Sequence, residues 1–133
     1  MNIVIDTNVV ISGTFFGGAP RQVLEAVVDS QVSAYASAEI IGEYQEIVEE
    51  MIRRKQGRLS VSVLAPFIQS LHIIETTSHV EASRDADDDK FIECAIDSRA
   101  LYIVSGDRDL LVLERYDDIR IITAAEFCKR FLQ

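Results

Sequence analysis

The sequence predicts an α/β fold of three layers, in which a central parallel sheet of five strands lies between two layers of helices. Short runs of apolar, often β-branched residues alternate with segments whose apolar residues recur every 3.6 positions. Strands that alternate with helices in this way pair in parallel and carry helices on both faces of their sheet. The length of 133 residues and the apolar content of 48% fit one domain, residues 1–133, with a substantial core.

The first strand is expected at Ile3–Ile5, a β-branched run suited to a strand that is buried on both faces. The segment Asp6–Asn8 offers capping side chains directly after it. Glycines at positions 13, 17 and 18 predict a loop over residues 12–19. A helix over residues 20–29 and a strand over residues 32–36 are expected to follow.

The clearest helix in the sequence is expected to begin after Ser37 and to end near Lys55, just before a glycine. Apolar residues recur along it with a period of 3.6, namely Ile40, Ile41, Tyr44, Ile47, Val48, Met51 and Ile52. Ser60 is expected to open a further helix that reaches Leu71. Pro66 lies inside that segment and favours a kink or a later start.

The second half of the chain is expected to continue the alternation of strands and helices. A polar loop over residues 77–86 separates its first strand from its first helix. The expected elements are a strand at residues 72–76, a helix at 88–98, a strand at 102–105, a short helix or turn at 107–113, a strand at 120–123 and a helix at 124–132.

The net charge of −9 argues against non-specific binding of a polyanion by the whole surface, although local fields matter more than the sum. The most basic stretch is Arg53–Lys55 with Arg58. It is either a solvated helix end whose cations complement the helix dipole or a patch that grips a nucleic-acid backbone. Cys94 and Cys128 lie in apolar helical contexts and are expected to be small buried hydrophobes. No apolar run could span a bilayer and no cationic leader segment is visible, so we expect a cytoplasmic protein without a membrane partner.

Acidic residues follow two of the apolar runs that are predicted to form central strands. Asp6 directly follows the first run, and Asp107 and Asp109 follow the run that ends at Val104. The carboxyl ends of parallel strands meet at one edge of a sheet, which is where open α/β sheets bind ligands. Carboxylates gathered there would repel one another by about 4 kcal/mol per close pair at an effective dielectric constant of about 20. A divalent cation would relieve this repulsion, so the sequence predicts a metal site with oxygen ligands.

Each acidic residue also has an ordinary structural interpretation. Asp6 could cap a helix. Among the glutamates of the helix after Ser37, Glu43 lies about 40° from Ile47 and is therefore best placed to point inward. Asp109 could cap the next turn, pair with Arg108 at the surface, or serve as an auxiliary ligand.

A run of three acids, Asp87–Asp89, precedes the helix expected at residues 88–98. Anions are favourable at a helix N-terminus, but one cap needs only one or two of them. We therefore expect Asp87 or Asp88 to cap the helix and Asp89 to enter the site.

Four segments, in this order, together resemble the PIN domain. They are IVIDTNV at residues 3–9, SAEIIGEY at 37–44, DDDKFIECA at 87–95 and VSGDRDL at 104–110. The resemblance extends from Met1 to about Thr123. It is greatest to the small prokaryotic branch that includes VapC-type toxins of toxin–antitoxin pairs.

The resemblance implies a metal-dependent ribonuclease with a sheet of strand order 3-2-1-4-5. The four acidic positions of the family fall on Asp6, Glu43, Asp89 and Asp107, and supporting positions fall on Thr7, Asn8 and Ser105. Sliding the match by one residue would replace Asp89 by Asp88. We favour Asp89 because Ile92 and Ala95 then stand three and six residues later, as in the family.

Hard carboxylate oxygens without a nearby set of His or Cys suit Mg²⁺ or Mn²⁺. We expect Asp6, Asp89 and Asp107 to hold one or two such ions. Glu43 is expected to orient or deprotonate the water that attacks the phosphate. The 3′-oxygen would then leave and a 5′-phosphate end would remain, as the resemblance implies.

The expected partners are an RNA substrate, an antitoxin protein and a second copy of the chain. Cationic candidates for RNA contact are Arg21, Arg53, Arg54 and Arg108. Phe15 and Phe16 are expected to pack against a second subunit or an antitoxin helix. One alternative is a non-catalytic PIN module that binds nucleic acid or protein. The other is a phosphohydrolase with Asp6 as nucleophile, although Asn8 stands where such enzymes commonly have a second Asp.

Overall fold

The computed structural model describes residues 1–55 and 61–132, and its centre is a mostly parallel sheet. The strand order is β3-β2-β1-β4-β6-β5. The strands are β1 (Asn2–Ile5), β2 (Ser33–Ala36), β3 (His72–Ile73), β4 (Tyr102–Val104), β5 (Arg115–Tyr116) and β6 (Ile119–Ile122). The five predicted strands correspond to β1, β2, β3, β4 and β6. Their predicted order in the sheet, 3-2-1-4-5, is confirmed. The edge strand β5 was not predicted. It pairs antiparallel with β6, and the two strands are joined by a tight turn in which Asp117 adopts a positive φ of 50°.

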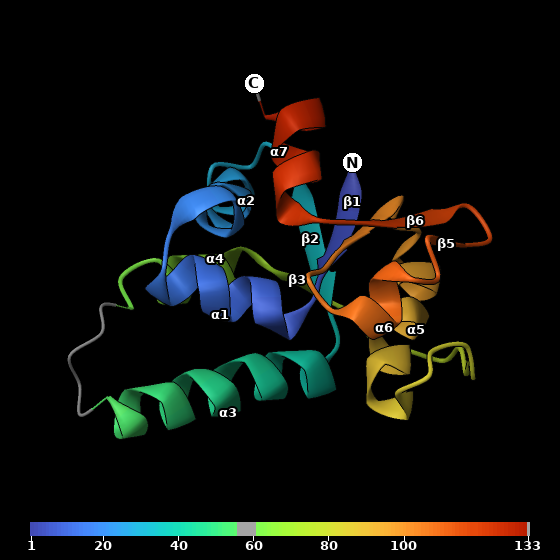
Figure 1. Ribbon diagram of the computed structural model, residues 1–133, viewed down its shortest axis with the longest axis horizontal. Coiled ribbons are helices and arrows are strands. Elements are labelled where there is room, and N and C mark those ends of the chain that lie inside the picture. The colour runs from blue at the N-terminus through green and yellow to red at the C-terminus, as the bar shows by residue number, and fades with distance from the viewer. Residues whose placement is uncertain (56–60, 133) are drawn as a thin grey trace.

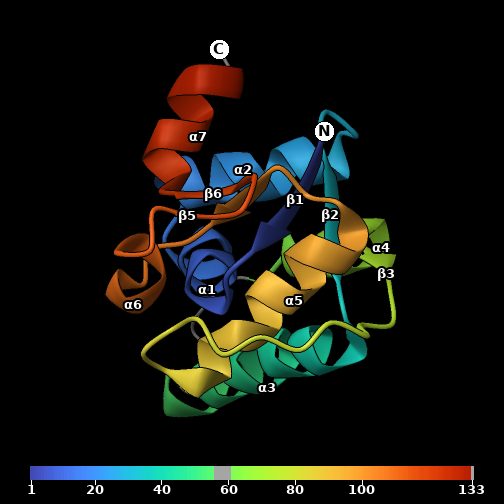
Figure 2. The same cartoon turned by 90° about the vertical axis from the view of Figure 1, so that its right-hand side faces the viewer.

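Helices cover both faces of this sheet, as the sequence predicts. In Figure 1, α1, α2 and α4 lie to the left of β1 and β2, and α5 lies to their right; Figure 2 shows α5 in front of the sheet. The helices are α1 (Thr7–Phe15), α2 (Gly18–Val28), α3 (Ala38–Arg54), α4 (Leu64–Ser70), α5 (Asp89–Ser98), α6 (Arg108–Leu111) and α7 (Ala124–Phe131), with a 3₁₀ turn η1 (Ala86–Asp88) before α5. The fold is therefore a three-layer α/β/α arrangement.

The predicted loop over residues 12–19 is wrong, because α1 continues to Phe15 and α2 begins at Gly18. Gly13 is buried inside α1 and lets α2 approach closely. A Cβ at Gly13 would lie 2.7 Å from Leu24 Cδ1 and 2.9 Å from the backbone of Pro20. This glycine therefore serves helix packing and does not break the helix. The turn itself is made by the positive φ angles of the two following glycines, at positions 17 and 18.

Two further boundaries differ from the prediction. The helix expected from Ser60 begins at Leu64, and Ser60 lies outside the described residues. Pro66 stands in the first turn of α4, where a missing N–H leaves no helical hydrogen bond unmade. The strand expected at residues 72–76 ends at Ile73, because its partner β2 ends at Ala36.

The two central strands form the most buried part of the core. Ile3, Val4 and Ile5 of β1 and Ile103 and Val104 of β4 are at most 1% exposed. Each fully buried side chain of this kind contributes about 1.5–3 kcal/mol to stability. The carboxyl ends of β1 and β4 are therefore held rigidly side by side, and the residues that follow them share one edge of the sheet.

Candidate metal centre

Asp6 follows β1 and points toward the end of β4. Its backbone N–H donates to Val104 O at 2.9 Å, which extends the pairing of the two strands to the site. Asp6 occupies the N-cap position of α1, yet its side chain makes no capping hydrogen bond. Its Oδ2 accepts a hydrogen bond from Ser105 Oγ at 2.7 Å instead. The ordinary capping role therefore does not account for this side chain.

Asp107 follows β4 and shares Ser105 with Asp6. The Asp107 N–H donates to Ser105 Oγ at 2.9 Å, and Asp107 Oδ1 accepts from the Asp109 N–H at 3.0 Å as the cap of α6. Ser105 is completely buried and therefore fixes the two aspartates relative to each other. Burial raises the pKa of Asp6; the hydrogen bond from Ser105 opposes the rise, and the charges of Asp107 and Glu43 add to it.

Asp88 is the third carboxylate of this group. It is only 8% exposed, and its Oδ2 has no hydrogen-bond partner among the residues that the structure describes. Burial is the largest of the effects that raise the pKa of Asp88 to about 8, followed by the hydrogen bond with Asp107 and the charges of Asp107, Asp6 and Asp85. A buried carboxylate oxygen without a partner is costly unless a cation satisfies it. A buried carboxylate of this kind, beside the charges of Asp6 and Asp107, fits a hard divalent cation.

The carboxylate of Asp89 is directed elsewhere, which differs from its expected place in the site. Its Oδ1 accepts hydrogen bonds from the N–H groups of Ala82, at 3.2 Å, and Ser83, at 2.8 Å. Asp88 belongs to the 3₁₀ turn and Asp89 begins α5, so the rotation of about 100° per helical residue separates the two side chains. The neighbouring residue Asp88 faces Asp107 in its place.

Asp89 is the first of three carboxylates at intervals of four residues on α5 that bind the preceding loop. Glu93 Oε2 accepts from the Val80 N–H at 3.1 Å. Asp97 Oδ2 accepts from the N–H groups at positions 77 and 78, at 2.7 and 3.0 Å. We call residues 77–83 the strap. It runs along α5 in Figure 2 and leads directly to Arg84 and Asp85 at the metal centre.

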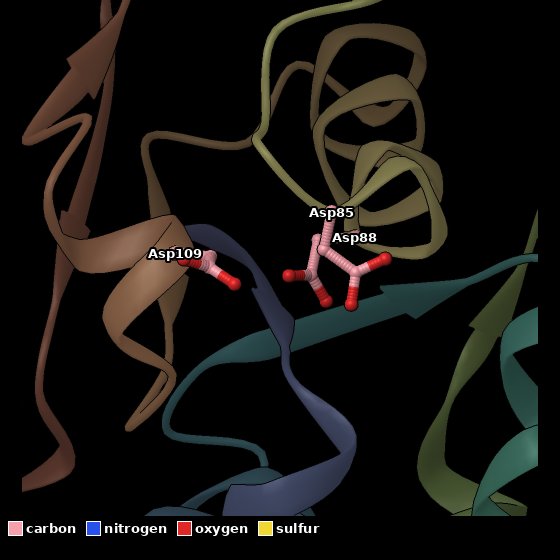
Figure 3. A group of neighbouring side chains, drawn as sticks. All are labelled: Asp85, Asp88 and Asp109. Atoms are coloured by element: carbon pink, nitrogen blue, oxygen red, sulfur yellow. The ribbon is translucent and has the colours of Figure 1, made fainter.

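Asp85, Asp88 and Asp109 form a second group that overlaps the first. One carboxylate oxygen from each lies within 4.8 Å of the other two, and Figure 3 shows the three side chains converging from η1 and α6. Arg84 Nη2 lies 2.9 Å from Asp109 Oδ1. The sequence-based prediction was a loop at Asp85 and gave no indication of its place in this group. The signal was its position three residues before Asp88, because residues i and i+3 of a 3₁₀ turn share one side.

Glu43 lies at the border of the site and is paired. Its Oε2 accepts a hydrogen bond from Thr7 Oγ1, and its Oε1 lies 2.7 Å from Lys90 Nζ. The adjacent Tyr44 donates its hydroxyl hydrogen to Ile5 O and thereby attaches α3 to β1. Burial lowers the pKa of Lys90, but the hydrogen bond and the charge of Glu43 outweigh it and raise this pKa. Lys90, which sequence analysis missed, follows the three-acid run directly.

The four predicted arginine contacts divide into two groups. Arg21 donates to the carbonyls of Gly13 and Thr14, both at 2.8 Å, and so caps the end of α1. Arg54 pairs with Glu50 at 2.8 Å across one turn of α3. The remaining candidates, Arg53 and Arg108, are exposed, as is Asn8, and Arg58 lies outside the described residues.

The histidines lie apart from the carboxylates of the candidate metal centre. His72 stacks on Tyr35, with ring centroids 4.8 Å apart, and His79 lies on the strap, 3.6 Å from Glu93. The centre therefore offers only oxygen ligands within the described part of the chain. Oxygen sets of this kind suit Mg²⁺ or Mn²⁺ better than Zn²⁺ or Cu²⁺.

No helix in residues 1–55 and 61–132 combines the length and the apolar character that crossing a membrane requires.

Comparison with known proteins gives a family match over most of the chain. The model of the PIN domain matches residues 2–109, a range that contains every carboxylate described above. The uncharacterized protein MJ1680 of Methanocaldococcus jannaschii is 29% identical over 143 residues, which cover 98% of this chain and 92% of that protein. No solved structure matches the chain.

Proposed function

Because the chain belongs to the PIN domain family, we propose that it is a metal-dependent endoribonuclease that cleaves phosphodiester bonds of RNA. The family supports a nuclease that uses divalent metal. The observation that carries the proposal is the buried, unpartnered Oδ2 of Asp88 beside Asp6 and Asp107. Three carboxylates in this arrangement repel one another unless a cation or a proton lies among them.

The proposed metal ligands are Asp6, Asp88 and Asp107, with Asp88 in the role that the sequence suggested for Asp89. Asp85 and Asp109 stand beside them as further oxygen donors, directly or through water. Bound Mg²⁺ or Mn²⁺ would lower the pKa of the attacking water and offset the charge that grows on the scissile phosphate.

The other residues of the site position these groups. Ser105 holds Asp6 and Asp107 at their present separation through its two hydrogen bonds. Glu43, held by Thr7 and Lys90, orients the water for attack in line with the bond to the 3′-oxygen. The water oxygen bonds to phosphorus, its proton passes to solvent, and the bond from phosphorus to the 3′-oxygen breaks. The 3′-oxygen takes a proton from solvent, and a 5′-phosphate end remains.

Finer assignments extend this proposal. The exposed Arg108, next to Asp107, is the best placed of the predicted cations to contact an RNA phosphate near the centre. The likeness to the small prokaryotic PIN branch supports a toxin of a type II toxin–antitoxin pair, a homodimer and a cytoplasmic location. Phe16 is 70% exposed beside Phe15 and would suit contact with an antitoxin helix or a second subunit.

The test is an assay of the purified protein on RNA with Mn²⁺. Wild type should cleave, and Asp6→Asn and Asp88→Asn should each lose activity by about 100-fold or more. Full activity in Asp6→Asn would contradict the proposal. Calorimetric titration with Mn²⁺ separates an enzyme from an inert PIN module, because a module that has lost its activity through its metal site should bind the ion poorly.

A further inference from the structure

A cavity of about 370 Å³ opens next to the candidate metal centre. Part of its lining follows three neighbouring strands: Asn8 comes after β1, Ser105 and Gly106 after β4, and Thr123 after β6. Val9 and Ser12 of α1 and residues near the start of α2 and α7 complete the walls. The cavity therefore lies at the same sheet edge as the carboxylates, between the two helices.

The backbone between Ser105 and Asp107 connects the cavity with the metal centre. Ser105 lines the cavity and also hydrogen-bonds to Asp6 and Asp107. Gly106 is exposed, and a Cβ added to it would meet no atom within 4 Å. A ligand can therefore pass Gly106 closely while one part of it lies at the carboxylates and another in the cavity.

The chemistry of the walls favours a largely apolar group. The exposed lining is mostly apolar and includes Val9, Ala19, Pro20 and two alanines at the start of α7, and no Lys or Arg among residues 1–55 and 61–132 lines the cavity. Asn8 also lines the cavity, and its exposed side-chain amide has no hydrogen-bond partner in the described part of the chain. The volume falls in the lower part of the range of small-ligand sites, about 300–1,000 Å³. Apolar faces with a polar edge are the features of a nucleobase, whereas a phosphate would call for cations.

We propose that this cavity holds the nucleobase next to the scissile phosphate and that the Asn8 amide hydrogen-bonds to the edge of that base. The inference rests on the proposed ribonuclease function and adds a base preference at one position of the substrate. Single-stranded RNA is recognised in this way, by unstacked bases whose faces and edges contact the protein.

A variant that fills the cavity can be matched with a control. Ala125 is the second residue of α7, is exposed and lines the cavity. Ala125→Leu therefore places a larger side chain in the cavity and keeps a good helix former at this position. Ala65 is likewise an exposed second residue, in α4, and does not line this cavity. Ala65→Leu is therefore the control, and unchanged melting temperatures would establish that both variants fold.

The experiment uses single-stranded RNAs that carry one abasic site at successive positions around the cleavage point. For wild type and Ala65→Leu, an abasic site at one position beside the scissile phosphate should lower kcat/KM about tenfold. Ala125→Leu should cleave the intact RNA about tenfold more slowly and show no further loss from that abasic site. An equal abasic effect in Ala125→Leu and wild type at every position would overturn the proposal.

A binding measurement separates this inference from the proposed function. The same RNAs, fluorescently labelled, are titrated with each protein in Ca²⁺ and followed by anisotropy. If no variant cleaves RNA in Mn²⁺, the ribonuclease proposal fails. The cavity is then judged by affinity alone. If the abasic site weakens RNA binding by wild type but not by Ala125→Leu, the result supports base binding in the cavity. If it weakens binding equally in both proteins, the result contradicts base binding.

Discussion

Asp88 and Asp89 are neighbours in the chain, yet their carboxylates have different surroundings. Asp88 faces Asp107, and Asp89 binds the strap. Sequence analysis favoured Asp89 over Asp88 for the site, and in the structure it is Asp88 that lies beside Asp107. The decision depends on where the 3₁₀ turn ends and α5 begins, and a shift of one residue rotates every following side chain by about 100°.

The raised pKa of Asp88 predicts an effect on stability in the absence of metal. Its pKa is about 8 in the folded protein and near 3.8 when unfolded, so the folded state disfavours the ionised form. The free energy of unfolding should therefore increase as the pH falls from above 8 toward 4. Asp88→Asn cannot ionise, and with EDTA at pH 9 it should melt about 5 °C above wild type.

Melting curves of both proteins at pH 9 and pH 4 would check this. The difference should vanish at pH 4, where Asp88 of the wild type is protonated. Asp89→Ala serves as the comparison, because it loses its two hydrogen bonds to the strap and should melt lower at both pH values. A lower melting temperature for Asp88→Asn at pH 9 would contradict the account.

At the scale of elements, periodicity predicted most helices and strands, and the misses have identifiable causes. Gly13 was interpreted as a loop residue because a glycine breaks isolated helices, whereas its role depends on the approach of Leu24 and Pro20. The strand β5 has only two residues, too few for a period to be recognised. The strap was predicted as a loop, but its carboxylate contacts with α5 depend on tertiary structure.

The strap gives a prediction of its own. Asp97→Ala removes the acceptor for the N–H groups at positions 77 and 78, so these amides should exchange with solvent about tenfold faster. Stability should fall by about 1–3 kcal/mol, since two such hydrogen bonds are lost and each contributes about 0.5–1.5 kcal/mol. Hydrogen exchange followed by mass spectrometry would measure the effect, with Glu46→Ala, an exposed residue of α3, as control. Unchanged exchange at the two amides would show that the carboxylate does not hold the strap.

At the scale of the molecule, the strand order was expected from the resemblance to the PIN domain, and β1 and β4, the two apolar runs that end in acids, lie side by side at its centre. That order alone brings Asp6 next to Asp107. Asp85 and Lys90 could not be placed in the same way. Asp85 lies near the centre because the strap leads to it, and Lys90 lies there because α5 is paired with α3 through Glu43. The sequence therefore predicted the position of the centre better than its full set of residues. Part of the net charge of −9 also lies at this edge of the sheet, where bound cations would offset it.

The most direct test of the central claim, that Asp6, Asp88 and Asp107 hold the ion, is calorimetric titration of Mn²⁺ into wild type, Asp88→Asn and Asp89→Asn. Asn at position 89 keeps an oxygen that can accept from the strap, so this variant is a matched control. We predict that Asp88→Asn weakens Mn²⁺ binding by about tenfold to 100-fold, while Asp89→Asn stays within about threefold of wild type. Loss of binding in Asp89→Asn together with unchanged binding in Asp88→Asn would contradict the assignment.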